Sequence, residues 1–233
     1  MRIVYKAKDV VQVFRLGTTS NEKIIDSKNE KIVQTYSFSK KQYELVASGK
    51  QFGMKDFFSV ADSNCLDCLF NEFGKCYTHK FNQYIGFKSM LKSIVKDYPT
   101  WGSLPVDYNI EDIIQMSKDR YVRFGTYGEP SLHPNNVIKQ MSKNSKSWTG
   151  YTHQWRNELF GDVFMASTHS KDEEQQARAI CYRSFVVSDS KVDGLVGCPA
   201  SKEGGYKSNC AKCNLCSGTS GTKTDKSINI LTH

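Results

Sequence analysis

The sequence has no apolar run long enough to cross a membrane. No stretch reaches the roughly 18 consecutive apolar residues of a membrane-spanning helix, and residues 1–6, Met-Arg-Ile-Val-Tyr-Lys, lack the apolar core of a secretory signal peptide. Also absent are the glycine-rich phosphate loop ending in Lys-Ser or Lys-Thr, the nucleophile elbow of hydrolases, and the His-Glu-x-x-His zinc helix. These absences exclude several common enzyme classes and predict a cytoplasmic protein with no membrane contact.

Cysteine, in contrast, is abundant, with eight residues in a chain of 233. Cys181 stands alone between Ile180 and Tyr182, where a small buried side chain is expected. The other seven form two groups: Cys65, Cys68 and Cys76, and Cys198, Cys210, Cys213 and Cys216. Cysteines separated by two residues can turn their thiolates toward one metal centre, whereas the half-cystines of secreted domains are usually spread along the chain. We therefore predict metal ligands in a reducing cytosol rather than disulfides.

The C-terminal group offers four thiolates, which are enough for a closed metal site. Zinc sites usually pair two Cys-x2-Cys hairpins that lie apart in the sequence. Here Cys210, Cys213 and Cys216 follow one another at steps of three, a run that resembles the loop around a cubane cluster in bacterial ferredoxins. This spacing favours an auxiliary [4Fe-4S] cluster, with zinc as the alternative.

The N-terminal group, Cys65-x2-Cys68-x7-Cys76, offers only three thiolates. His79 could complete a zinc site with three cysteines and one histidine. Alternatively, three thiolates on a [4Fe-4S] cluster leave one iron open to a substrate or cofactor, and catalysis requires such an open position. The residues are compatible with either a zinc site or an open cluster, and an open cluster would make the protein an enzyme.

Strands and helices alternate through the middle of the chain. Residues 1–54 predict a β-rich N-terminal extension with strands at 3–5, 10–16 and 31–38, and a strand at 56–60 is expected to lead into the first cysteine group. Helices are then predicted at 83–98, 110–117, 135–143, 153–160 and 171–182, and strands at 121–125, 148–152, 163–166 and 184–187. Such alternation is typical of βαβ units. The fold class is therefore α/β, with a partial (β/α) barrel-like parallel sheet over residues 55–193.

The C-terminal part of the chain changes in composition. From about residue 194 it is rich in Gly, Ser, Lys and Cys and has few large apolar residues, so it cannot bury a core of its own. Residues 194–218 are therefore predicted to be a Cys-rich cluster-binding segment that needs its metal to become ordered. Residues 219–233 are predicted to be a flexible tail.

Ligands of parallel α/β sheets gather at the carboxyl ends of the strands. Polar segments are predicted to follow strands there at 126–130, 151–154, 167–169 and 188–189. We expect one shared rim to collect them. Within it, Glu129 is either a site residue or a solvated turn residue, and Trp155 either stacks on a base or packs in the core. His153 and His169 could serve as acid, base or ligand, or only bond their neighbours.

Several short motifs lie between residues 55 and 218. They are Cys65-x2-Cys68 with Gly74-Lys75-Cys76-Tyr77, then Arg123-Phe-Gly-Thr-Tyr-Gly-Glu-Pro130, Thr149-Gly-Tyr-Thr-His-Gln-Trp-Arg156, and Cys198-Pro-Ala200 with Cys210-x2-Cys213-x2-Cys216. As a set they resemble a group of phage-encoded proteins that look like radical S-adenosylmethionine enzymes. A phage-encoded protein of this kind would work in the cytoplasm of the host cell.

The resemblance implies a partial β/α barrel with three cysteines after its first strand, where S-adenosylmethionine chelates the open iron of a [4Fe-4S] cluster. It places Gly128 and Glu129 at the end of the second strand, where they would bind the amino group of the cofactor. A carboxylate accepts charge-assisted hydrogen bonds from an ammonium group, and glycine lets the backbone approach closely. The family ordinarily spaces its cysteines as Cys-x3-Cys-x2-Cys, so cofactor cleavage does not follow from the match alone.

The formal net charge of +8 would suit a partner rich in phosphate. Bound thiolate clusters would subtract from this charge. The substrate could be a small molecule, a nucleotide or a nucleic acid, and no oligomeric state is predicted. The alternative function is a non-enzymatic, zinc-binding basic module that contacts nucleic acid. A third possibility is a relative of the radical enzymes that keeps its clusters for folding or docking after losing turnover.

Overall fold

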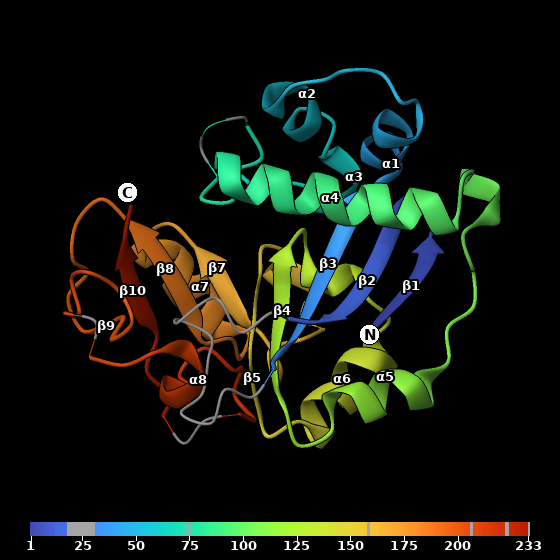
Figure 1. Ribbon diagram of the computed structural model, residues 1–233. Helices are drawn as coiled ribbons and strands as arrows, with labels where there is room; N and C mark the ends of the chain where they lie inside the picture. The colour runs from blue at the N-terminus through green and yellow to red at the C-terminus, as the bar shows by residue number, and fades with distance from the viewer. Residues whose placement is uncertain are drawn as a thin grey trace.

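The structure is a mixed α/β arrangement of two open five-stranded sheets with helices packed around them (Figure 1). It is a computed structural model that describes residues 1–17, 31–72, 74, 76–157, 159–205, 207–221 and 224–232. Positions 158, 206, 222, 223 and 233, which fall in the predicted helix, cluster segment and tail, lie outside the described residues. In the described part of the chain, no helix is long and apolar enough to cross a membrane.

The first sheet joins the N-terminal strands to the middle of the chain. Strands β1 (Arg2–Ala7), β2 (Val10–Leu16) and β3 (Val33–Ser39) pair antiparallel in this order. Strand β3 then pairs in parallel with β4 (Tyr121–Tyr127), and β4 with β5 (Ser147–Thr149). The β-rich residues before position 54 therefore extend the same sheet that carries β4.

The second sheet is entirely parallel. Its order is β6 (Tyr151–Thr152), β7 (Met165–Thr168), β8 (Ser184–Ser188), β10 (Ile228–Leu231) and β9 (Val196–Gly197). Only Gly150 separates β5 from β6, so the parallel strands of the first sheet lead directly into the second. A Cβ atom on Gly150 would lie 2.8 Å from the ring of Phe164, and only glycine fits this close approach.

Strand β10 corrects the prediction of a flexible C-terminal tail. It lies between β8 and β9, with Ile228 paired to Phe185 of β8. Ile228 is buried, and the side-chain amide of Asn229 donates hydrogen bonds to Val186 O and Ser188 Oγ. The apolar residues of β10 are few and are flanked by Ser, Thr and Lys residues, so their pattern does not indicate a strand. Burial in the sheet determines the conformation of this segment.

One face of the first sheet is covered by helices α1 (Lys40–Ala47), α2 (Met54–Phe58), α3 (Asp62–Cys65) and α4 (Phe81–Asp97), with a 3₁₀ turn η1 (Trp101–Ser103). The prediction of a strand at 56–60 is wrong, because this segment is the end of α2. The Gly53 N–H donates to Asp56 at the start of that helix, and Phe57 and Phe58 are both buried against Tyr84 of α4. An aromatic run of this kind fits either a buried helix or a strand.

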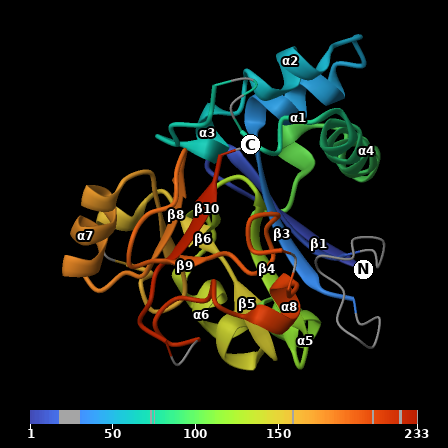
Figure 2. The same ribbon diagram turned by 90° about the vertical axis from the view of Figure 1, so that its left-hand side faces the viewer.

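The other face packs on α5 (Ile110–Ser117) and α6 (Asn135–Asn144), two helices that the sequence predicted at these positions. Short 3₁₀ turns η2 (Pro130–Leu132) and η3 (Trp155–Asn157) follow β4 and β6, and η3 replaces the helix predicted at 153–160. Helix α7 (Lys171–Ala179) packs on the second sheet, and α8 (Cys210–Cys213) lies near β5. Figure 2 shows α3 and α8, which carry cysteines of the two groups, at opposite ends of the strands.

Candidate functional site

The first cysteine group is built by α3 and the turn that follows it. Cys65 is the last residue of α3, and the Cys68 N–H donates to the Cys65 carbonyl at 3.2 Å, which keeps these two residues in one tight turn. Burial raises the pKa of Cys65, and the nearby charges of Cys68, Cys76 and Glu129 raise it further. The three cysteines that the sequence grouped are therefore neighbours in space, and they follow a helix rather than the predicted strand.

The group is fixed over the carboxyl ends of β3 and β4 by its neighbour Asn64. The Asn64 side chain donates to Ser37 O of β3 at 2.9 Å, and its carbonyl accepts the Glu129 N–H at 2.7 Å just beyond β4. Gly128 has a φ of +77°, and a Cβ atom there would lie 2.7 Å from Ser37 O. Only glycine fits this close approach, and the contact joins the cysteine loop to both strands.

Glu129 is buried, with 3% of its surface exposed, so the alternative of a solvated turn residue is wrong. Its carboxylate accepts hydrogen bonds from Thr152 Oγ1 at 2.6 Å, the His153 N–H at 3.0 Å and the Ser131 N–H at 3.1 Å. Burial by itself would raise the pKa of Glu129, but the bonds from His153 and Thr152 outweigh it and lower the pKa. With the His153 ring also against Oε2, four donors surround this ionised group, about as many as a carboxylate accepts.

His153 connects this carboxylate to the cysteines. Its Nδ1 lies 3.7 Å from Glu129 Oε2, and its Nε2 lies 3.4 Å from Cys68 Sγ. Burial alone would lower the pKa of His153, but the contacts with Cys68 and Glu129 raise it to about 10. The imidazole therefore carries a positive charge beside the Cys68 sulfur at neutral pH.

The expected rim forms from three of the four polar segments. The ring of His169, after β7, lies 6.0 Å from that of His153 and 4.8 Å from that of Phe70. The fourth segment, after β8, bonds to the last residues of the chain: Ser188 Oγ accepts a hydrogen bond from Asn229 and Asp189 accepts one from Thr232. Trp155 is buried at 2% exposure and takes the packing role.

The second cysteine group is held by α8 and the loop after it. The Asn209 side chain caps α8, and Cys216 O accepts the Gly150 N–H at 2.9 Å where the two sheets meet. Burial raises the pKa of Cys216, and Cys210, Cys198 and Cys213 raise it further. The four predicted cysteines are thus neighbours. Cys210 shares a small cavity with Tyr121 and Val122 at the start of β4, the end opposite to the first group.

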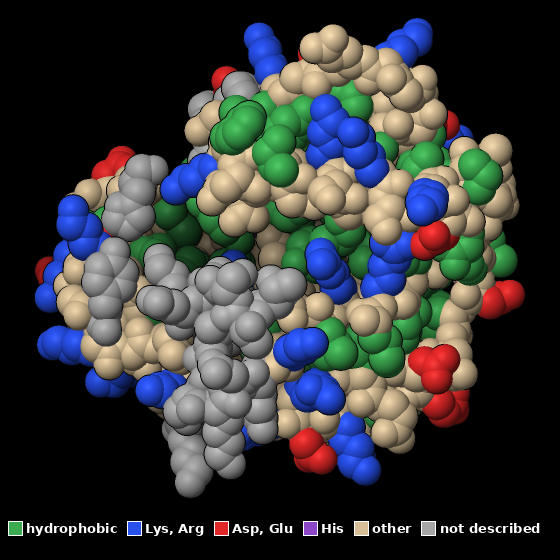
Figure 3. All heavy atoms as spheres, viewed as in Figure 1, with side chains coloured by type: hydrophobic (Ala, Val, Ile, Leu, Met, Phe, Trp, Pro, Cys, Tyr) green, Lys and Arg blue, Asp and Glu red, His purple; other side chains and the backbone are tan. Residues whose placement is uncertain are grey.

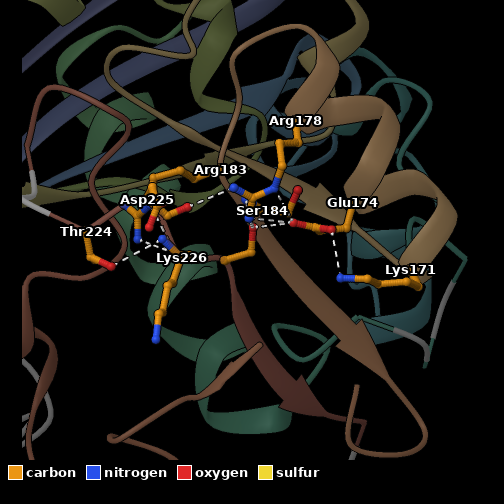
Figure 4. A network of polar contacts seen from close by, with 9 residues as sticks. Lys171, Glu174, Arg178, Arg183, Ser184, Thr224, Asp225 and Lys226 are labelled. Atoms are coloured by element: carbon orange, nitrogen blue, oxygen red, sulfur yellow. Dashed lines mark hydrogen bonds and ion pairs between the residues drawn. The ribbon is translucent and has the colours of Figure 1, made fainter. Parts of the chain in front are cut away.

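Sequence reasoning missed Arg183, which holds this loop on the second sheet. Arg183 is buried and donates to Leu215 O and Ser217 O, each at 2.9 Å, and to Lys226 O. The first two carbonyls flank Cys216. Figure 4 shows Arg183 beside a second network, in which buried Glu174 accepts hydrogen bonds from Lys171, Arg178 and Ser227. No motif marks these residues, because only the folded sheet brings them together.

His79 and Cys181 differ from expectation. His79 Nδ1 accepts the Gly74 N–H at 3.1 Å, which occupies the lone pair a metal would need, and the ring packs on Phe58. Cys181 is exposed rather than buried and has a φ of +65°. Among the residues that the structure describes, no three His, Cys, Asp or Glu side chains are placed where they could hold a metal ion.

Comparison of the chain with protein-family models, with curated proteins and with solved structures gave no match.

Proposed function

We propose that this chain is an iron–sulfur protein of the radical S-adenosylmethionine type. In this proposal, Cys65, Cys68 and Cys76 hold an open [4Fe-4S] cluster, and Cys198, Cys210, Cys213 and Cys216 hold an auxiliary cluster. One observation carries it: three neighbouring cysteines lie over the carboxyl ends of two parallel strands, beside the buried carboxylate of Glu129. In parallel α/β folds this edge is where ligands bind.

The strand order supports the proposal. Strands β3, β4 and β5 are parallel to one another, and β6, β7, β8 and β10 continue in parallel after Gly150. Helices α1 to α5 lie between β3 and β4, α6 lies between β4 and β5, and α7 lies between β7 and β8, as in the β/α units of an open barrel, whereas only Gly150 separates β5 from β6. Cys65 to Cys76 then follow the first of these parallel strands, and Gly128 with Glu129 ends the second.

The donor set of each group fits a cluster. Thiolates that bind different irons of a cubane lie further apart than ligands around one ion, so neighbouring cysteines can serve a cluster without forming a single-ion site. In the first group the donors are three thiols with no acidic side chain bonded to them in the described structure. Each sulfur instead has a neutral or basic hydrogen-bonding neighbour: Asn64 at Cys65, His153 at Cys68 and Thr78 at Cys76.

A reduced cluster held by these cysteines would supply the one electron that cleaves the C5'–S bond of S-adenosylmethionine, giving methionine and a 5'-deoxyadenosyl radical that becomes 5'-deoxyadenosine by taking a hydrogen atom from a substrate. The chain's own residues would bind the cofactor and orient the cysteines. The ionised carboxylate of Glu129 suits the ammonium group of the cofactor, and His153 holds Cys68 in place through a charged hydrogen bond. Figure 3 shows a hollow with a hydrophobic floor between the upper helices and the second sheet, where a substrate could enter.

The test is cofactor cleavage by the full chain, purified without oxygen and reduced. S-adenosylmethionine should yield 5'-deoxyadenosine and methionine in equal amounts. Glu129→Gln should lower the yield at least about tenfold, because a neutral amide loses one charge-assisted hydrogen bond. Glu44→Gln, on the exposed side of α1, is the matched control and should keep full yield. If the iron-loaded wild-type protein forms no product, the chain is a relative of the radical enzymes that has lost turnover.

The zinc-binding basic module stays as the second candidate. Its supporting observation is the net charge of +8, with Lys and Arg side chains spread over the face shown in Figure 3. This candidate predicts zinc without sulfide and a salt-dependent affinity for nucleic acid of any sequence. Metal analysis separates the two candidates directly.

A further inference from the structure

Exposed apolar side chains gather along the first cysteine group and the start of α4. Eight large hydrophobic side chains are exposed in the part of the chain that the structure describes, and five of them belong to residues 66–85: Leu66, Leu69, Tyr77, Phe81 and Ile85. Leu66 and Tyr77 directly follow two neighbouring cysteines of the group. Single exposed apolar residues are common, whereas a concentration of them in one place marks a contact surface.

Phe81 and Ile85 are not used to pack α4 on the rest of the protein. The helix packs through five buried side chains, Tyr84, Phe87, Met90, Leu91 and Ile94. Phe81 is 69% exposed and Ile85 is 48% exposed. Residues four positions apart lie on the same side of a helix, so these two side chains form an apolar strip that points into solvent.

The surface around this strip is basic. Residues 73–96 contain five lysines and no Asp or Glu. Among these lysines, Lys80, Lys92 and Lys96 are exposed. Figure 3 shows hydrophobic side chains gathered around the beginning of α4, with Lys and Arg side chains beside them. The strip is therefore an apolar centre with a positively charged border.

This combination favours an acidic protein as the partner. A second copy of the chain carries the same net charge of +8, so two such surfaces would repel each other. A nucleic acid would attract the lysines and stack on aromatic rings, but it offers little to aliphatic side chains such as Leu69 and Ile85. An acidic protein with an apolar centre complements both parts of the surface.

We propose that Tyr77, Phe81 and Ile85, with the lysines along α4, form the docking surface for an acidic one-electron carrier protein. The inference rests on the proposed function, in which the first cluster must gain an electron before S-adenosylmethionine is cleaved. Because Tyr77 follows Cys76, a protein bound here lies against the loop of the first cysteine group. The reduced carrier loses one electron, the cluster gains it, and no atom is transferred. Complexes of redox partners have small interfaces, which suits a strip of this size.

The first test measures binding by isothermal titration calorimetry. The full chain, purified without oxygen, is titrated with two acidic carriers, a plant-type [2Fe-2S] ferredoxin and a flavodoxin. At least one should bind with a Kd of roughly 1–100 μM at low salt and more weakly at high salt. Phe81→Ser combined with Ile85→Ser should weaken this binding at least about tenfold. The matched control is Val106→Ser, at a 62% exposed site between η1 and α5, and it should bind like the wild type.

The lysines are tested by reversing their charge. Lys80→Glu combined with Lys92→Glu should weaken carrier binding at least about tenfold, because the border then repels an acidic partner. Lys118→Glu combined with Lys143→Glu makes the same change in net charge at exposed positions of α5 and α6, and it should leave binding within about twofold of the wild type. Equal weakening in both pairs would show attraction by net charge alone and would refute the docking surface.

The second test follows the electron. In stopped-flow absorbance, the iron-loaded chain should oxidise the reduced carrier, and the Phe81→Ser, Ile85→Ser variant should do so at least about tenfold more slowly. Dithionite, which needs no docking surface, should reduce the clusters of both proteins at the same rate. A variant that is slow with dithionite as well has lost its cluster rather than its partner, and this result would contradict the inference.

The remaining outcomes separate this inference from the proposed function. If neither carrier binds the wild type, or if single-stranded DNA or vesicles of acidic phospholipid bind more tightly through the same residues, the inference is refuted. If the iron-loaded chain cleaves S-adenosylmethionine with dithionite but binds neither carrier, the proposed function stands without it. If the wild type holds no iron but a carrier still binds through Phe81 and Ile85, the docking surface stands and the proposed function fails.

Discussion

Glu129, His153 and Cys68 form a chain of contacts that crosses from the end of β4 to the first cysteine group. The buried carboxylate fixes the imidazole, and the imidazole fixes the thiol. Each member has its partner inside the protein, so the geometry does not depend on solvent. Sequence alone indicated Gly128 and Glu129 through the resemblance, but it left His153 with several roles. The contact with Cys68 favours a role for His153 in orienting this cysteine. The sequence could not show this contact, because only the fold brings the end of β6 beside α3.

His133 provides a prediction for the pH dependence of stability. It is 2% exposed and packs against Phe14 with the two rings tilted, and neither of its ring nitrogens has a hydrogen-bond partner among the described residues. Burial lowers its pKa from 6.5 to about 3. Because the unfolded chain then binds the proton more tightly, the stabilisation is complete above about pH 6.5 and is lost progressively as the pH falls toward 3.

Urea unfolding at pH 7 and pH 5 measures this effect. Between these values the wild type should lose about 2 kcal/mol more unfolding free energy than His133→Phe, whose aromatic ring keeps the contact with Phe14 but cannot titrate. The variant serves as the control for every other group that titrates in the same range. Equal losses in the two proteins would show that His133 does not stay neutral in the folded state.

At the scale of secondary-structure elements, Arg183 ties the second cysteine group to the start of β8. Arg183→Met leaves the buried carbonyl of Ser217 and the partly buried carbonyls of Leu215 and Lys226 without their donor. We expect a loss of roughly 3 kcal/mol in unfolding free energy. We also expect faster proteolysis within residues 198–226. Arg156→Met, whose side chain is 58% exposed, is the control and should change stability by less than about 0.5 kcal/mol. Similar proteolysis of both variants would contradict the role of Arg183.

The helices and strands with clear periodicity were predictable from the sequence. The amphipathic helices α4, α5 and α6 and the strands β4 and β8 lie close to their predicted positions, because their apolar residues recur with one period. The adjacent aromatic residues Phe57 and Phe58 show neither a helical nor a strand periodicity, and their burial against α4 makes the segment helical. Strand β10 is short and polar at its flanks, and only its place between β8 and β9 defines it.

At the scale of the whole molecule, the two cysteine groups lie at opposite ends of the same parallel strands. Asn64 binds the first group to the carboxyl ends of β3 and β4, while Cys210 of the second lies near the start of β4. The sequence predicted the membership of each group from spacing alone. It could not predict that the two groups lie at opposite ends of these strands, because that relation depends on how the two sheets join at Gly150.

The most direct test of this account is the content of iron, acid-labile sulfide and zinc per chain after purification without oxygen. The wild type should hold about eight irons and eight sulfides, which is two cubane clusters. Cys76→Ala should keep only the four irons or so of the second group, and Cys181→Ala, which changes the exposed cysteine outside both groups, should keep all of them. One or two zinc ions without sulfide, or an iron content unchanged in Cys76→Ala, would contradict the account.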